Sequence, residues 1–181
     1  GKELHYSTYK QRCPDRDSCP YFSPECEAPT RSGYVNHLLL SSEPLLGENT
    51  WLPLGDAGGL TQFGVNLVAL EPGANSSMRH WHLNEDEFVM VTQGALILVM
   101  DDGETEMLPG DCAAFPAGVA DGHCLINRTE SVASFLVVGS RAPSEVATYP
   151  DMNIKVESEA GRSRFLNADG TDFIPSETGE N

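Results

Sequence analysis

The chain has 181 residues, of which 27 are acidic and 11 are basic, and its formal net charge at pH 7 is -16. A chain this acidic is not expected to bind nucleic acid or an anionic membrane surface. Its longest apolar run, at residues 95–100, is far shorter than the roughly 20 residues that cross a membrane as a helix. We therefore expect a soluble protein, cytoplasmic by default, with an organelle or an oxidising compartment left open.

Residues 1–34 are predicted to form an irregular N-terminal arm. The segment contains four prolines and has no helical or strand periodicity. Its three cysteines, Cys13, Cys19 and Cys26, are spaced C-x5-C and C-x6-C, unlike the close pairs of structural zinc sites. We expect no zinc there. A disulfide between two of these cysteines and three free thiols are both open alternatives.

Residues 35–150 are predicted to form one all-β domain. Short apolar runs alternate with glycine and proline breaks, which is typical of an antiparallel sandwich or barrel. Residues 52–59 are predicted to be a loop. Residues 151–181 are predicted to be a polar C-terminal extension, with a turn at Asp169 and Gly170 and apolar contacts at Phe165, Phe173 and Ile174. The predicted strands are 35–40, 65–71, 88–92, 95–100, 104–108, 112–115, 123–127 and 133–139.

The stretch RHWHLNEDEF, residues 79–88, concentrates histidines and carboxylates in a chain with five histidines. If it is extended, His80 and His82 point to one face, and Arg79 and Trp81 point to the other. A tight bend after His82 would return Glu87 beside the two imidazoles. Two imidazoles and a carboxylate on one face are typical of a metal site. A solvated strand end with incidental histidines is the alternative interpretation.

A second informative stretch runs from Gly110 to Asn127, where His123 opens a predicted strand. Together the two stretches resemble the paired motifs of the cupins. The first motif is matched at Gly73, His80, His82, Glu87 and Gly94, with one extra residue before His80. The second is matched at Gly110, Pro116, Gly118, His123 and Asn127, with two extra residues before His123. The similarity covers residues 59–141 and looks closest to bacterial single-domain cupins with an RHWH…EDEF signature.

This resemblance implies a double-stranded β-helix, or jelly-roll barrel, with one divalent transition metal inside. It implies that His80, His82, Glu87 and His123 are the ligands. Three imidazoles and a carboxylate suit Fe, Mn, Co, Ni, Cu or Zn. Four protein ligands leave open positions on the ion, so a Lewis-acid or redox role is expected. A structural zinc site would more often be closed and rich in cysteine.

Other residues near the motifs have more than one interpretation. Glu87 or a metal-bound water is the candidate general base. Asn127 faces the same way as His123, so it is predicted either to orient a ligand or substrate or to cap a strand end. Arg79 is expected to pack between the sheets or to pair on the outer face, and a role as a substrate anchor is the alternative. The residues expected to line an apolar barrel are Val89, Val91, Leu125 and Phe135.

The charge distribution bears on the substrate. Between residues 32 and 140 the chain has no lysine and only two arginines, Arg79 and Arg128. Phosphate recognition normally recruits several cationic donors or a helix N-terminus. We therefore expect a metal-dependent enzyme, of dioxygenase, lyase or isomerase type, that acts on a small non-phosphorylated molecule. A non-catalytic subunit or scaffold of a larger protein assembly, and a ligand-binding or sensor module, are the alternatives, and a homodimer is compatible with each.

Overall fold

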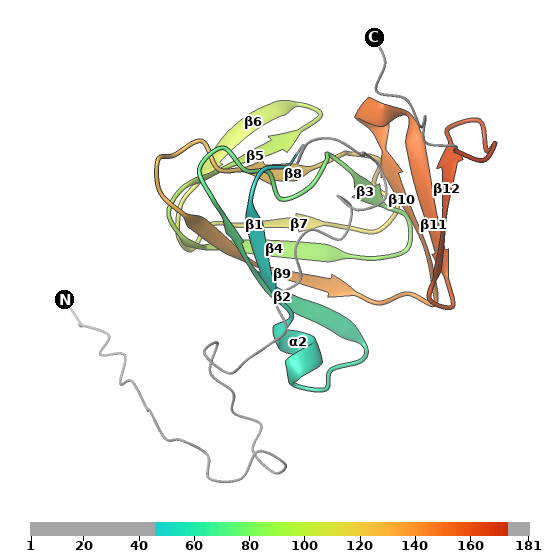
Figure 1. Ribbon diagram of the computed structural model, residues 1–181, viewed down its shortest axis with the longest axis horizontal. Helices are drawn as coiled ribbons and strands as arrows, with labels where there is room; N and C mark the ends of the chain where they lie inside the picture. Colours follow the sequence, from blue (N-terminus) through green and yellow to red (C-terminus); the bar gives the residue numbers. More distant parts are fainter. Residues whose placement is uncertain (1–45, 174–181) are drawn as a thin grey trace.

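The computed structural model describes residues 46–173. The predicted N-terminal arm, the strand at 35–40, the three cysteines of the arm and the residues after 173 lie outside this range. Within it almost all of the regular secondary structure is β-strand (Figure 1). The strands are β1 (Asn49–Leu52), β2 (Phe63–Leu70), β3 (Trp81–His82), β4 (Glu87–Gln93), β5 (Leu96–Met100), β6 (Gly103–Met107), β7 (Cys112–Phe115), β8 (Cys124–Ile126), β9 (Ala133–Ser140), β10 (Ser144–Tyr149), β11 (Ile154–Glu159) and β12 (Arg162–Asn167).

The strands form antiparallel sheets in two layers. One layer is a five-stranded sheet in the order β1-β2-β9-β4-β7. The other contains a three-stranded sheet, β6-β5-β8, and a four-stranded sheet, β12-β11-β10-β3. A bridge between His80 and His123 connects these two sheets, because each residue donates its backbone N–H to the other's carbonyl, at 3.1 and 2.9 Å. The result is the all-β jelly roll that the sequence predicts.

The core lies between the two layers. Along β4 and β9, alternate residues point inward, and the buried ones among them are apolar. Val89, Val91, Leu125 and Phe135, which were predicted to line the barrel, are all at most 3% exposed. Each such burial contributes about 1.5–3 kcal/mol relative to an exposed side chain. This apolar filling occupies most of the barrel and leaves polar side chains at one end.

Several elements differ from the sequence prediction. The predicted loop at residues 52–59 contains the end of β1 and a short helix, α2 (Leu54–Ala57). After a 3-10 turn, η1 (Pro150–Met152), the polar extension adds β11 and β12, which the pattern did not predict. Figure 1 shows β10, β11 and β12 side by side at one end of the barrel. No helix of the described range is long and apolar enough to cross a membrane.

A small apolar cluster supports this end of the molecule. Tyr149 and Ile154 are its buried centre, with Val156 and Phe165 packed against them. These residues lie on one face of β10, β11 and β12, because Tyr149 pairs with Ile154 and Val156 pairs with Phe165. The inner surface of the barrel therefore continues beyond β3 onto this three-stranded flap.

Candidate metal centre

His80 and His123 come together through their backbones. They are direct partners in the antiparallel bridge that connects the sheets, and such partners carry their side chains on the same face. Their ring centroids are 5.1 Å apart. The pairing therefore fixes two imidazoles, 43 positions apart in the sequence, on one inner wall of the barrel.

His82 joins the same wall because it lies two residues after His80 in an extended segment. Its ring meets that of His80 edge to face, with centroids 4.9 Å apart. The backbone of His82 is also held, since its carbonyl accepts the N–H of Gly118 at 2.9 Å. Gly118 has φ of +78°, a conformation that glycine adopts without a steric penalty. This contact ties the loop of the second motif to the strand of the first.

Glu87 reaches the histidines from the opposite layer. It is the first residue of β4 and lies between Phe115 of β7 and Gly139 of β9. Its Oε2 is 3.3 Å from Nε2 of His82 and 3.5 Å from Nε2 of His123. Ligand atoms of His80, Glu87 and His123 all lie within 4.8 Å of one another, a grouping that could hold one metal ion.

Aromatic neighbours fix the orientation of two of the imidazoles. The ring of Phe115 stacks on His123, with centroids 3.5 Å apart and an interplanar angle of 3°. Tyr149 stacks on His80 at 5.4 Å and 24°. His80 is further oriented through Nδ1, which donates to the carbonyl of Met78 at 2.9 Å. Since a carbonyl only accepts, the proton of neutral His80 is on Nδ1, and its Nε2 is left with a free lone pair.

Unpartnered nitrogen atoms provide a direct test of whether the site fits a cation. Both ring nitrogens of His123 are buried and have no hydrogen-bond partner among residues 46–173. Leaving a buried polar group unpaired costs about 1–3 kcal/mol. A divalent ion facing Nε2 would satisfy one of these atoms, and nitrogen and carboxylate ligands suit Fe, Mn, Co, Ni, Cu or Zn. The residues present therefore fit a metal of this class.

The protonation states of His80 and Glu87 also suit metal binding. Burial lowers the pKa of His80 to about 4, so this imidazole is neutral at pH 7. Burial alone would raise the pKa of Glu87, but attraction by His123 and His82 outweighs it and holds that pKa below its ordinary range. For His82, burial lowers the pKa, and the nearby Glu87 carboxylate more than offsets this and raises it. The site thus pairs an ionised carboxylate with imidazoles.

The site opens into a cavity of about 360 Å³. Its inner wall is apolar, with Val89, Phe135 and Val137, and its mouth is polar. Among the described residues that line it, Arg141 is the only lysine or arginine, and its guanidinium pairs with Asp56 and donates to the carbonyl of Leu60 at 3.2 Å. The carboxylates on the wall are Glu85, Asp86 and Glu87.

Asn127 lies away from this cavity and is fully buried. Its Nδ2 donates to the carbonyls of Leu70 and Ser131, both at 2.8 Å. Its Oδ1 accepts from the backbone N–H of Thr129 at 3.0 Å and from the Thr129 hydroxyl at 2.8 Å. The side chain thus holds together the loop between β8 and β9. These are the contacts of a residue that caps a strand end, which is one of the two roles predicted for Asn127.

Arg79 also points away from the cavity. Its guanidinium makes a two-point contact with Asp151 at 3.0 and 2.6 Å and a further contact with Asp101. These partners raise the pKa of Arg79, chiefly because its guanidinium donates hydrogen bonds to Asp151. Gly122, which lies beside Arg79, is one of the two extra residues before His123. A Cβ there would lie 3.2 Å from Cγ of Arg79, so the extra loop packs tightly on the outer face.

Four residues of the site were not among the candidates from the sequence: Phe115, Arg141, Glu145 and Tyr149. Phe115 lies in the strand predicted at residues 112–115 and Tyr149 lies beyond the last predicted strand, and neither belongs to a motif. Arg141 lies one position beyond the range in which cations were counted. Glu145 and Tyr149 lie on β10, and only the pairing of that strand with β3 brings them to the histidines. No local sequence signal reveals this pairing.

Comparisons with known proteins agree with this architecture. The cupin domain model matches residues 66–139. A crystal structure from Silicibacter pomeroyi, described as a sugar phosphate isomerase from a cupin superfamily, is 59% identical, has a TM-score of 0.68, and covers 70% of this chain and 80% of its own. A putative sugar phosphate isomerase from Acidithiobacillus ferrooxidans is 29% identical, with a TM-score of 0.65 and coverage of 71% and 81%. The search of curated proteins gives no match.

Proposed function

Because this chain belongs to the cupin superfamily, we propose that it is a metal-dependent enzyme acting on a small non-phosphorylated molecule by isomerase, lyase or dioxygenase chemistry. The observation that carries the proposal is the buried Nε2 of His123, which has no hydrogen-bond partner among residues 46–173 and lies 3.5 Å from the Glu87 carboxylate in a cavity. A fold that only needed a core would lose stability by keeping these groups there. His80, His82, Glu87 and His123 are the proposed ligands.

A bound divalent ion would supply Lewis acidity or redox chemistry at this wall of the cavity. The side chains around it have separate tasks. His80 and His123 are held by stacked rings, so their nitrogens face the cavity without rearrangement. Glu87 is ionised and offers a carboxylate oxygen to accept a substrate proton. Its lowered pKa limits it to the more acidic protons of a substrate.

Tyr149 contributes a hydrogen-bond donor to the cavity wall. Burial raises the pKa of its phenol to about 12, and the charge of Glu87 adds to this, so the hydroxyl stays protonated at neutral pH. The apolar inner wall excludes water from the reacting groups. A cavity of about 360 Å³ accommodates a small molecule rather than a polymer.

Charge around the cavity favours a substrate without phosphate. Arg141 is the one lysine or arginine among the described lining residues, and Asp56 already pairs with it. Glu85 and Asp86 add negative charge at the mouth. A phosphate dianion would have to displace Asp56 and approach these carboxylates. A neutral polyhydroxylated or hydroxycarbonyl compound meets no such cost.

A sugar phosphate isomerase is the second candidate, because a 59% identical protein is described as one. In that case Arg141 would leave Asp56 and bind the phosphate. The decisive experiment supplies the metal-loaded full chain with matched pairs of free sugars and their phosphates and follows isomerisation by NMR. We expect turnover of a free compound, and its loss in His123→Ala. Turnover of a phosphorylated sugar at about 1 per second or more would instead establish the second candidate.

Arginine variants separate the two candidates further. Under the second candidate, Arg141→Gln should raise KM for the phosphorylated substrate at least tenfold. Arg128→Gln is the matched control, because Arg128 is an exposed arginine that also pairs with one carboxylate, Glu104. Under our proposal both variants leave KM for the free compound within about twofold. Absence of any turnover from fully metal-loaded protein would favour the scaffold or sensor alternatives.

A further inference from the structure

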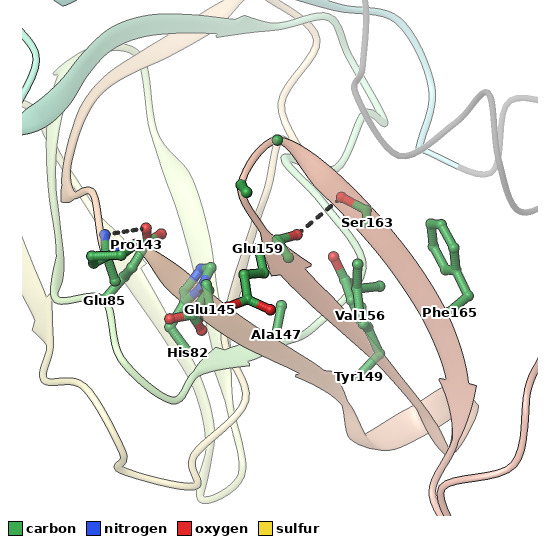
Figure 2. A pocket seen from close by; sticks show the side chains of 14 residues that line it. His82, Glu85, Pro143, Glu145, Ala147, Tyr149, Val156, Glu159, Ser163 and Phe165 are labelled. Carbon is green, nitrogen blue, oxygen red and sulfur yellow. Dashed lines mark hydrogen bonds and ion pairs between the residues drawn. The ribbon is translucent and has the colours of Figure 1, made fainter.

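Glu145 is a buried carboxylate beside the metal centre that the cupin motifs do not include. It is 8% exposed and lies on β10. His82 pairs with Ala147 of that strand, so Glu145, two residues earlier, shares its face and lies alongside His82. Figure 2 shows the two side chains next to each other at the inner end of the β10–β12 flap. His82 lines both the barrel cavity and a second cavity of about 300 Å³ on the flap, and Glu145 lines the second one.

The position of the carboxylate is fixed by the backbone. Oε1 accepts the N–H of Leu83 and Oε2 accepts the N–H of Asn84, both at 2.8 Å. Among residues 46–173 no lysine or arginine forms an ion pair with Glu145. Burying a carboxylate without a cation is costly, and the two charge-assisted hydrogen bonds offset only part of that cost. We therefore expect a further group with positive charge or a hydrogen-bond donor beside the Glu145 carboxylate.

That group is His82. Nδ1 of His82 is buried and forms no hydrogen bond among residues 46–173, and Oε1 of Glu145 lies within ion-pair distance of it, at 3.4 Å. On the far side of the same ring, Nε2 lies 3.3 Å from Oε2 of Glu87. The two ring nitrogens thus face two different carboxylates. A carboxylate at Nδ1 favours the tautomer with its proton there and leaves the Nε2 lone pair for a metal ion.

We propose that Glu145 is the positioning residue for His82: it holds the imidazole in the orientation and tautomer that bind the ion through Nε2. This inference rests on the metal site of the proposed function. The main competing role is that of a ligand to a second ion, because ligand atoms of His82, Glu85 and Glu145 also lie within 4.8 Å of one another. However, both oxygens of Glu145 already accept backbone hydrogen bonds, and Glu85 accepts the N–H of Ala142 at 2.8 Å.

The test measures Co²⁺ binding to the metal-free full chain by the visible absorption of the bound ion. Glu145→Gln keeps the shape of the side chain but places an amide N–H where only an acceptor fits. We expect it to raise the Kd for Co²⁺ about 10- to 100-fold and to change the absorption spectrum. Glu157→Gln is the matched control, since Glu157 is an exposed carboxylate on the neighbouring strand β11. Glu157→Gln should leave the Kd for Co²⁺ and the absorption spectrum unchanged.

A double-mutant cycle separates positioning from a general structural role. In a His82→Ala background, Glu145→Gln should have no further effect on Kd, whereas any loss of folding stability should appear in both backgrounds. An equal loss of Co²⁺ affinity in the His82→Ala background would overturn the inference. So would an unchanged Kd in the single variant, or two Co²⁺ ions per wild-type chain and one in the variant. Failure of the wild-type chain to bind Co²⁺ would overturn both this inference and the proposed metal site.

The wild-type protein offers a second measurement that does not depend on a variant being folded. In the Zn²⁺-loaded chain, long-range ¹H–¹⁵N correlation spectra report which ring nitrogen of each histidine carries the proton. We expect His82, assigned by comparison with His82→Ala, to carry it on Nδ1. A proton on Nε2, with the ion on Nδ1, is incompatible with a carboxylate partner at Nδ1 and would overturn the proposal.

Discussion

Replacing Asn127 by alanine tests whether this residue serves the fold or the metal centre. The side chain is fully buried and takes part in four hydrogen bonds, two to carbonyls and two from Thr129. At about 1 kcal/mol net for each bond, the variant loses about 4 kcal/mol, less some regained side-chain freedom. We expect the free energy of unfolding to fall by about 3 kcal/mol. Because Asn127 does not line the cavity, Co²⁺ affinity should stay within about threefold of the wild-type value.

The assay is urea unfolding of the metal-free protein followed by tryptophan fluorescence, with Co²⁺ titration of the folded variant in parallel. Thr129→Val is the matched control. It removes one of the bonds to Asn127 and leaves the other three, but it also removes the contacts of the same hydroxyl with the backbone of Ser131, so it should cost about 1–2 kcal/mol. The reasoning fails if Asn127→Ala lowers the unfolding free energy by less than about 1 kcal/mol while Co²⁺ affinity falls tenfold or more. That result would assign Asn127 to the ion.

Three further predictions follow from the site and its supports. His82→Ala should lose most of the bound metal by elemental analysis, and full occupancy would contradict the assignment of His82 as a ligand. Gly122→Ala should lower the unfolding free energy by about 1–3 kcal/mol, because its methyl would press on Arg79 and on the proline after β10. Gly64→Ala is the control, and it should lose less, because a methyl there would make only ordinary contacts. Asp151→Asn should cost about 0.5–1 kcal/mol at neutral pH, since the pair with Arg79 is partly exposed. Because the hydrogen bonds from Arg79 lower the pKa of Asp151 in the folded state, the wild-type advantage should be present above the ordinary aspartate pKa and vanish as pH falls through the lowered value. A difference that grew in acid would contradict this sign.

The barrel strands were predictable because their signals are local. β7 is Cys112–Phe115, the predicted range, and it is bounded by Gly110 and Pro116. β11 and β12 carry no such signal. Their inner face mixes Val156 and Phe165 with serines, so alternation is weak, and what makes them strands is pairing with β10. Pairing across many positions in the chain is a tertiary effect that overrides local propensity.

In the metal centre, too, local motifs indicated some residues, and only strand pairing brings in the others. The motifs indicated the four proposed ligands, and the structure brings those side chains to one cavity. The residues that hold the ligands in place were not visible in the sequence. Phe115 reaches His123 because β7 pairs beside Glu87, and Glu145 reaches His82 because β10 pairs with β3. The spacing in a motif identifies residues that are close in sequence. The residues that orient the ligands come from strands that become neighbours only after folding.

The loop before His123 is anchored at both ends and exposed in the middle. Gly118 donates its N–H to His82 at one end, and His123 exchanges backbone hydrogen bonds with His80 at the other. Between them Val119 and Ala120 are exposed. Changes in length there are absorbed at the surface, since closing a slightly longer loop costs only a few tenths of a kcal/mol. Natural insertions and deletions should therefore accumulate at residues 119 and 120, and an engineered affinity tag or fluorescent label placed there should leave the imidazoles where they are.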